Sequence, residues 1–399
     1  MTDHKAQSRR RFLKTAAGAA TLAATTLHAP AILAQPSGVK VGFLLPYTGT
    51  YAQLGKAITD AFKLHVNEHG GKLGGRTIEY VQVDSEANPA KATDNTNRLV
   101  NLEKVDVIVG PVHSGVAAAM VRVTRESGTL TIDANAGAAV VTGAMCAPNI
   151  FRTSFTNWQP AYPMGKVLAE RGMKKAVTLT WKYGAGEEAI GGFVENFKAH
   201  GGSIVKDLWV PFPKVEFQSL LTEIASLKPD AVFVFFAGGG AVKFVKDYAA
   251  AGLRNSVPLF GSGFLTDGTL KAQGDAAQGL ETTLHYGDSL ILPKNLAFRE
   301  MYAKAAGREA DVYAVQGYDA AQLLRVGLEA AHGDIKSMKT MIGAMESAEI
   351  DSPRGKFTLS KAHNPIQDIY LRKVVGLENK VESVAHKALA DPATGCKMA

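Results

Sequence analysis

The sequence predicts an α/β fold in which two doubly wound parallel-sheet lobes are joined by a multi-strand hinge. Short apolar runs alternate with longer segments of helical periodicity, a pattern typical of parallel strands with helices on both faces. This alternation occurs twice along the chain, and the segments after Gly279 are too few to build a third core. Ligands of such sheets bind at the carboxyl ends of the strands, so we expect the site in a cleft between the lobes.

The first series centres on a strand, a turn and a helix near its middle. Gly110-Pro111 ends the strand, and Ser114 is placed to cap a helix whose apolar residues recur with helical spacing. The free N–H groups at such a helix start suit a small anion. Strands of this series are expected at Val39–Leu45, Thr77–Val83, Val105–Val109 and Leu130–Ile132, and helices at Tyr51–His69, Pro89–Glu103 and Ser114–Ser127.

The second series repeats this architecture, and later elements return to complete both lobes. Its strands are expected at Ala176–Thr180, Ser203–Val210, Ala231–Phe236 and Val257–Phe260, and its helices at Glu187–His200, Phe217–Leu227 and Ala241–Ala251. Later strands are expected at Leu280–Gly287, Lys356–Leu359 and Asp368–Val374, and later helices at Asn295–Ala306, Val312–Ala331 and Ile335–Ala344. Lobe 1 is therefore expected at residues 35–156 plus 287–363, and lobe 2 at residues 157–286 plus 364–399.

The N-terminus carries the features of an export signal. Ser8-Arg9-Arg10-Arg11-Phe12-Leu13-Lys14 precedes an apolar run rich in Ala and Thr, which matches a twin-arginine signal cleaved after Ala34. The run is shorter than the roughly 20 residues that a membrane span needs, which argues against an anchor. We therefore expect residues 1–34 to direct the chain through the Tat machinery to the periplasm.

Charge and cysteine content narrow the class of protein further. Residues 1–34 hold five basic residues and one acidic residue, so their removal lowers the formal net charge from +7 to +3. The mature chain is therefore not basic enough to indicate nucleic-acid binding. The two cysteines, Cys146 and Cys396, lie in loop-like surroundings, and in an oxidising compartment we expect them to form a disulfide. The alternative is one buried thiol and one free thiol in the tail.

Two motifs resemble enzyme signatures but have simpler interpretations. His65 and His69 have the H-x-x-E-H spacing of a zinc site, yet His65 shares the apolar stripe of its helix. Gly184 and Gly186 follow a strand as in a dinucleotide fingerprint, but Glu187 and Glu188 in the next helical turn would repel a pyrophosphate. The sequence has no phosphate-binding loop and no nucleophile elbow, so we expect no metal, no cofactor and no catalysis.

Turns at successive strand ends carry small residues, hydroxyls, amides and aromatic rings, which suits a pocket with a polar end and an apolar slot. Together with the segments around them they form an ordered set over most of the chain. The set comprises Val39-Lys40-Val41-Gly42, Thr48-Gly49, Asn67, Gly70-Gly71, Gly74-Gly75, Asp84, Val109-Gly110-Pro111, Ser114, Tyr183-Gly184, Gly186, Phe217, Leu220, Gly252-Leu253, Tyr318-Asp319-Ala320 and Gly355-Lys356-Phe357. This set resembles the substrate-binding proteins of branched-chain amino acid ABC transporters, which have the type I periplasmic binding protein fold.

The resemblance implies a binding site. A serine and nearby backbone N–H groups hold the ligand carboxylate in that family, which assigns the role to Ser114 and the turn at Asn135-Ala136. A tyrosine before a glycine closes over the ligand from the second lobe, which Tyr183 matches. The expected site residues are Tyr47, Leu54, His113, Ser114, Asn135, Ala136, Phe155, Tyr183, Phe236, Gly263 and Phe264.

Two departures from the family pattern bear on the ligand. The place of the acidic residue that holds an amino acid's ammonium falls at Gly261-Ser262-Gly263, which has no acid, and an unpaired ammonium in a closed cleft would cost several kcal/mol. The place of a tyrosine falls at Gly238-Gly239-Gly240, which would open volume. Both favour a flat aromatic acid, benzoate-like or phenylpropenoid, although Asp133 near the site could still serve an ammonium or a hydroxyl.

The sequence therefore predicts a monomeric periplasmic receptor that delivers an aromatic monocarboxylate to an ABC permease in the inner membrane. A branched-chain amino acid receptor is the nearer alternative. An exported NAD(P)-dependent oxidoreductase is the more distant one.

Overall fold

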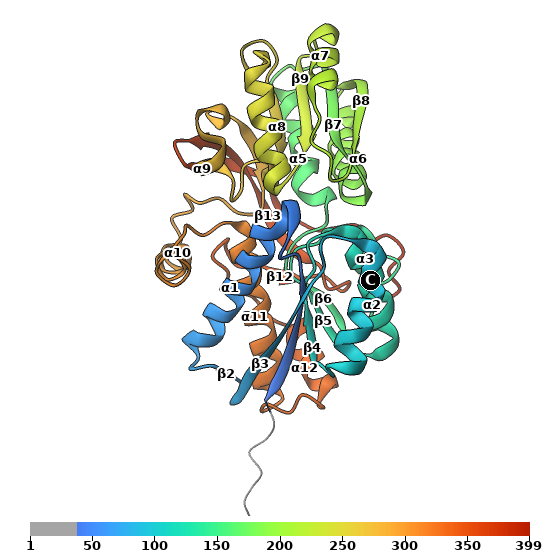
Figure 1. Ribbon diagram of the computed structural model, residues 1–399, viewed down its shortest axis with the longest axis vertical. Coiled ribbons are helices and arrows are strands. Elements are labelled where there is room, and N and C mark those ends of the chain that lie inside the picture. Colours follow the sequence, from blue (N-terminus) through green and yellow to red (C-terminus); the bar gives the residue numbers. More distant parts are fainter. Residues whose placement is uncertain (1–37) are drawn as a thin grey trace, which may run out of the picture. The chain divides into compact units, whose positions relative to one another are not determined.

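The computed structural model describes residues 38–399, which form two sheets with helices on both faces (Figure 1). The first sheet has the order β2-β3-β1-β4-β5-β6, and all its pairings are parallel except that of β2 with β3. Its strands are β1 (Val39–Leu45), β2 (Lys72–Leu73), β3 (Arg76–Asp84), β4 (Val107–Val109), β5 (Leu130–Asp133) and β6 (Ile150–Arg152). The short apolar strands are fully buried, as covered parallel strands should be.

Helices cover both faces of this sheet because successive residues of β1 point to opposite sides. Phe43 faces α1, where its ring meets Phe62 at 5.3 Å between centroids. Leu44 faces the other side and packs in a cluster with Val116 of α3. The covering helices are α1 (Ala52–Glu68), α2 (Pro89–Asn97), α3 (Ser114–Ser127) and α4 (Ala139–Thr142), joined late in the chain by α10 (Pro293–Ala306), α11 (Val312–Ala330) and α12 (Met338–Glu346).

The second sheet has the order β12-β13-β11-β10-β9-β7-β8, with β14 paired to β13. Strands β7 to β11 pair in parallel, whereas β12, β13 and β14 pair antiparallel. Its strands are β7 (Lys175–Lys182), β8 (Ser203–Pro211), β9 (Ala231–Phe235), β10 (Leu259–Ser262), β11 (Glu281–Leu284), β12 (Thr358–Leu359), β13 (Pro365–Val375) and β14 (Glu378–Leu389). The helices are α5 (Trp158–Glu170), α6 (Gly184–Ala199), α7 (Gln218–Leu227), α8 (Gly238–Ala250) and α9 (Leu270–Gln273), with α6 and α8 on opposite sides (Figure 1).

The chain passes between the two sheets at three places, after β6, after β11 and before β12. Buried ion pairs hold these crossings. Arg152 pairs with Asp133 at 3.3 Å, and Arg354 pairs with Asp319 at 3.4 Å while its guanidinium donates to the carbonyl oxygen of Thr153 at 2.6 Å. The expected doubly wound fold with a multi-strand hinge is thus confirmed.

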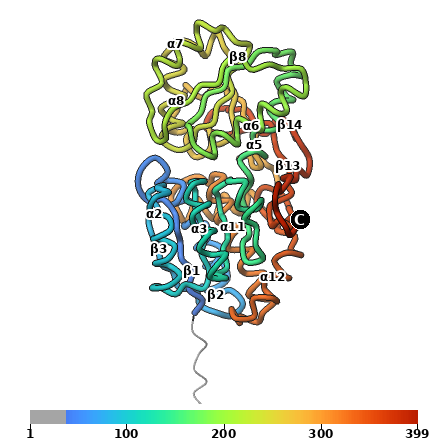
Figure 2. Tube along the Cα trace, turned by 90° about the vertical axis from the view of Figure 1, so that its right-hand side faces the viewer, coloured from blue at the N-terminus to red at the C-terminus, as the bar shows by residue number. Residues whose placement is uncertain are grey.

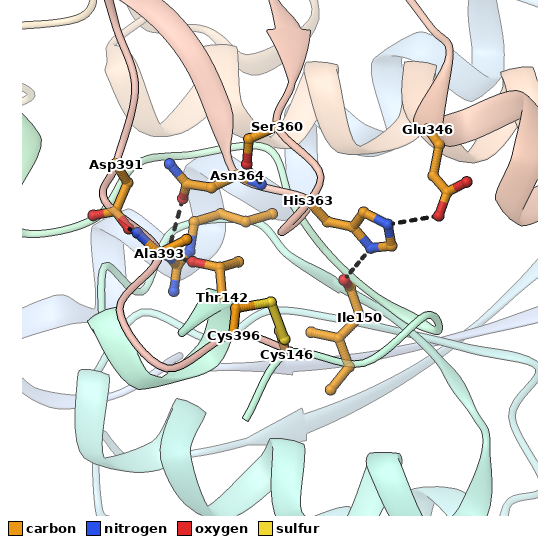
Figure 3. Close-up of a disulfide and its surroundings, with 11 residues drawn as sticks. Thr142, Cys146, Ile150, Glu346, Ser360, His363, Asn364, Asp391, Ala393 and Cys396 are labelled. Atoms are coloured by element: carbon orange, nitrogen blue, oxygen red, sulfur yellow. Dashed lines mark hydrogen bonds and ion pairs between the residues drawn. A yellow bond between two sulfur atoms is a disulfide. The ribbon is translucent and has the colours of Figure 1, made fainter. Parts of the chain in front are cut away.

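The C-terminal tail adds a covalent link. Figure 2 shows β13 and β14 side by side near α5, and β14, which is antiparallel to β13, leads toward the C-terminus. The tail then passes close to Thr142, and Cys396 forms a disulfide with Cys146 (Figure 3). The thiol pair expected from the sequence is therefore bonded here. In the chain-entropy model, a closed loop of this length stabilises the fold by up to about 5 kcal/mol.

Several element boundaries differ from the sequence-based expectation. The helix expected at Pro89–Glu103 is α2 followed by a π-helical stretch, Arg98–Leu102. Helix α5 was not expected because Pro163 lies inside it, and β14 was not expected because its mostly exposed side chains lack an apolar alternation.

Residues 38–399 pack as one compact unit, so the expected lobe boundaries stay a prediction. The expected twin-arginine signal lies outside the described residues. Within residues 38–399, no helix combines the length and the apolar character that crossing a membrane would require.

Candidate functional site

A small cavity lies between the two sheets, at the carboxyl ends of their strands. The first sheet, its helices and the crossing after β6 supply Tyr51, Leu54, Val112, Asn135, Gly137, Phe155, Asn157 and Tyr313. The second sheet and its helices supply Tyr183, Ala185, Phe235, Ala237 and Phe264. Strand ends converge here because parallel strands all finish at the same edge of a sheet.

Hydrogen bonds hold the two sides of the cavity together. The hydroxyls of Tyr51 and Tyr183 lie 2.9 Å apart. The Gly240 backbone N–H donates to Thr50 Oγ1 at 3.1 Å. Each bond joins a residue after β1 to a residue after β7 or β9, so the described conformation has the two lobes in contact over the cavity.

The polar end of the cavity is built around Asn157. Its Nδ2 donates to Ser114 Oγ at 3.1 Å and to Glu188 Oε2 at 2.7 Å. Because Ser114 Oγ accepts from Asn157, its own hydrogen stays available, and within residues 38–399 it has no acceptor. Glu188 also accepts from the backbone N–H of Ala139 at 3.1 Å. Burial raises the pKa of Glu188, and the bonds from Asn157 and Ala139 oppose that rise.

Aromatic rings line most of the remaining wall. The Phe155 and Phe264 rings have centroids 4.6 Å apart, and Phe264 lies 6.1 Å from both Phe235 and Tyr313. The Tyr313 side chain is buried, and within residues 38–399 its hydroxyl has no hydrogen-bond partner. Rings of this kind present flat apolar faces that suit another ring.

A chain of amides leads from the cavity wall toward the hinge. Asn135 Nδ2 donates to Gln316 Oε1 at 2.6 Å, so the other end of that amide, Nε2, faces His285 Nε2 at 3.0 Å as a donor. His285 therefore accepts through Nε2 and carries its proton on Nδ1. Burial lowers the pKa of His285 well below its ordinary value, which keeps the ring neutral.

Eight of the eleven expected site residues lie at the cavity or next to it. Leu54, Asn135, Phe155, Tyr183 and Phe264 line it directly. Ser114 is one hydrogen bond away through Asn157, and the His113 ring stacks on Tyr183 at 4.7 Å. Ala136 is buried beside Asn135 and donates its N–H to the carbonyl oxygen of Pro111.

Three expected residues lie elsewhere. The Tyr47 hydroxyl bonds Thr59 Oγ1 at 2.8 Å on α1. Gly263 packs against Arg372 and Leu284, where an added Cβ would lie 2.3 Å from the guanidinium. Phe236 lies in the core of the second lobe, because residue 235 is the one that faces the cavity and the next residue points the other way.

Two further expectations about the site are corrected. His113, not Ser114, caps α3, since its Nδ1 accepts from the Gly115 N–H at 3.0 Å. The glycines at 238–240 do not open the cavity, because a Cβ on Gly238 would lie 2.3 Å from the carbonyl oxygen of Thr50. Those glycines let the two lobes approach each other closely.

Asp133, which could have served an ammonium, is fully buried against Arg152 and does not line the cavity. Burial raises its pKa to about 7, and the Arg152 guanidinium opposes that rise. Among residues 38–399, no carboxylate lines this cavity.

Sequence reasoning missed several lining residues. The most prominent are Tyr51, Asn157, Phe235 and Tyr313. Tyr51 begins the helix predicted after the first strand, and Phe235 lies near the carboxyl end of a predicted strand, so both could have been found from their positions. Asn157 and Tyr313 had no such signal, since one lies on a crossing segment and the other begins α11, far along the chain.

The enzyme-like motifs have structural explanations. Arg325 Nε donates to His65 Nε2 at 3.3 Å, and burial lowers the pKa of His65 to about 3. Among residues 38–399, no cluster of three or more His, Cys, Asp or Glu side chains is arranged to hold a metal. Gly184 opens α6 directly after β7.

The fold and the cavity define a two-lobed binding protein. Residues 38–380 match the family model described as periplasmic binding protein, and the chain belongs to that family. Proteins of this family that serve ABC transporters bind small molecules and work with a permease.

Individual relatives agree with this assignment. The chain is 32% identical over 344 residues to Leu/Ile/Val-binding protein homolog 6 of Brucella melitensis, covering 84% of this chain and 87% of the relative. It is 53% identical to an ABC transporter solute-binding protein of R. palustris solved in complex with benzoate, with a TM-score of 0.89 and coverage of 90% and 100%. A Rhodopseudomonas palustris BisB5 solute-binding protein in complex with 3,4-dihydroxy benzoic acid is 33% identical, with a TM-score of 0.85 and coverage of 89% and 99%.

Proposed function

We propose that this protein captures an aromatic monocarboxylate in the cavity between its lobes and hands it to an ABC permease, without catalysis. The observation that carries the proposal is the lining itself. Within the part of the chain that the structure describes, six aromatic side chains and two amides surround the space, and no carboxylate lines it. The benzoate-bound and dihydroxybenzoate-bound relatives support the same ligand class.

The ligand carboxylate belongs at the polar end of the cavity in this proposal. Ser114 can donate its free hydroxyl hydrogen there, and α3 begins at the same residue with N–H groups pointing out of the helix. Hydrogen bonds to a charged group are worth about 1.5–3 kcal/mol each. The ring then lies among Phe155, Phe235 and Phe264, with Tyr183 closing over it.

A branched-chain amino acid remains the second candidate, because curated relatives carry that name. Its ammonium would need a paired carboxylate, and among residues 38–399 the side chains that line the cavity offer amide and hydroxyl oxygens instead. An isolated charge in a closed cavity is costly without a paired carboxylate.

Titration calorimetry of the purified protein with benzoate and separately with leucine, isoleucine and valine tests the proposal. We expect benzoate to bind and the three amino acids to give no measurable heat. Ser114→Ala should weaken benzoate binding by about tenfold or more. Ser127→Ala, an exposed serine at the other end of α3, serves as the matched control and should leave the affinity unchanged. The proposal would be refuted if leucine bound and benzoate did not.

A further inference from the structure

One polar group in the cavity is not used by the proposed carboxylate site. Tyr313 lines the cavity and is 1% exposed, and within residues 38–399 its hydroxyl has no partner. Tyr313 lies in the first turn of α11, which Asp311 caps by accepting from the Ala314 N–H at 2.9 Å. Its buried hydroxyl therefore has an open hydrogen-bonding position.

No neighbour of Tyr313 within residues 38–399 supplies a hydrogen-bond partner for its hydroxyl. The Phe264 ring lies 6.1 Å away, and it has no polar atoms. The other two tyrosines of the lining, Tyr51 and Tyr183, bond each other at 2.9 Å. Burial raises the pKa of Tyr313 well above its ordinary value, so the group is a neutral phenol that can donate and accept.

An unpaired buried hydroxyl is unfavourable, and the ligand decides whether it stays unpaired. An unsubstituted ring or an aliphatic side chain would remove water from Tyr313 and return no bond. A ligand that carries its own hydroxyl on the ring can donate to Tyr313 or accept from it. Sites built in this way discriminate strongly against analogues that lack the polar group.

We infer that Tyr313 is a specificity-determining residue and that the preferred ligand is an aromatic acid with a hydroxyl on its ring. This inference rests on the proposed function, since it names the subclass of aromatic acid that the same cavity takes. Tyr313 selects among aromatic acids, whereas the polar end near Ser114 would hold the carboxylate that all of them share.

Calorimetry with benzoate and with 2-, 3- and 4-hydroxybenzoate tests this inference on the wild-type protein and two variants. We expect at least one hydroxybenzoate to bind about tenfold more tightly than benzoate to the wild type. Tyr313→Phe should bring that ratio close to one while benzoate itself binds at least as well as before. Tyr302→Phe is the matched control, because Tyr302 is also buried, its hydroxyl has no partner among residues 38–399, and it does not line the cavity. It should leave the ratio unchanged.

The outcomes separate this inference from the proposed function. If benzoate binds and no hydroxybenzoate binds more tightly, the role of Tyr313 is refuted and the proposed function stands. A preference that survives in Tyr313→Phe also refutes that role. If none of the four acids binds, the proposed function and this inference both fail.

Discussion

Single residues at the cavity show how one ring can serve both the fold and the site. His113 caps α3 by accepting from the Gly115 N–H, and its ring stacks on Tyr183 and lies 4.9 Å from Phe212. The capping role needs a neutral imidazole, because a protonated Nδ1 cannot accept a hydrogen bond. Burial lowers the pKa of His113 to about 4, consistent with that requirement.

The stability contributed by His113 should therefore depend on pH. Its pKa lies below the unfolded value of about 6.5, so the native state binds fewer protons than the unfolded state between those values. The contribution is complete above pH 6.5 and is lost as pH falls toward 4, by about 1.4 kcal/mol per pH unit. We expect His113→Asn, which can still cap a helix but does not titrate, to lack this component.

Urea unfolding of the wild type and His113→Asn from pH 7.5 to pH 4 measures the effect. The difference between the two free energies of unfolding removes the contributions of the other titrating groups that both proteins share. We expect the wild type to lose stability relative to the variant as pH falls. A difference that stays constant across this range would show that His113 is not held neutral by the fold.

At the scale of elements, the end of β9 decides which ring belongs to the site. Phe235 is the last residue of the strand and lines the cavity, whereas Phe236 packs against Trp181, Phe217 and Phe244. The side chains differ by one position in a pattern with a period of two. Adjacent residues of the same type thus have different roles.

Exchanging each ring for leucine should separate those roles. Phe236→Leu should lower the free energy of unfolding by about 1 kcal/mol and leave benzoate affinity within about twofold. Phe235→Leu should weaken benzoate binding by about fivefold, because it removes a ring from the cavity wall. Each variant is the control for the other. Unfolding in urea and calorimetry measure the two quantities, and the reverse assignment of effects would contradict the placement of β9.

For the whole molecule, the contact between lobes is as important as the cavity lining. Glu188 on α6 accepts from Ala139 at the start of α4 and from Asn157 on the crossing segment. It does not line the cavity, but it connects the second lobe to the polar end of the site. A ligand that binds the closed arrangement depends on every interaction that stabilises that arrangement.

Removing this connection should therefore weaken binding without removing a ligand contact. We expect Glu188→Ala to reduce benzoate affinity by about tenfold. The variant loses the hydrogen bonds that the Glu188 carboxylate makes across the lobes, and this destabilises the closed state relative to the open one. Glu187→Ala changes the adjacent residue, which is exposed, and should have no effect. Calorimetry measures both variants. Equal affinities would mean that Glu188 does not contribute to closure.

Much of the fold and part of the site follow from the sequence. Strand β1 and helix α3 have the predicted boundaries, because buried parallel strands and an amphipathic helix leave strong local patterns. The same patterns located the strand ends, and with them Asn135, Phe155, Tyr183 and Phe264. The resemblance to a receptor family also came from residues that keep their order along the chain.

Tertiary structure decided what no local pattern contains. Tyr313 lines the cavity because α11 returns to the first sheet late in the chain. Asp133 does not line the cavity and is instead paired with the buried Arg152. The glycines at 238–240 were expected to open space, but Thr50 of the other lobe approaches and fills it. Local periodicity fixes which face of an element is apolar, whereas contacts between distant segments fix which side chains meet around a ligand.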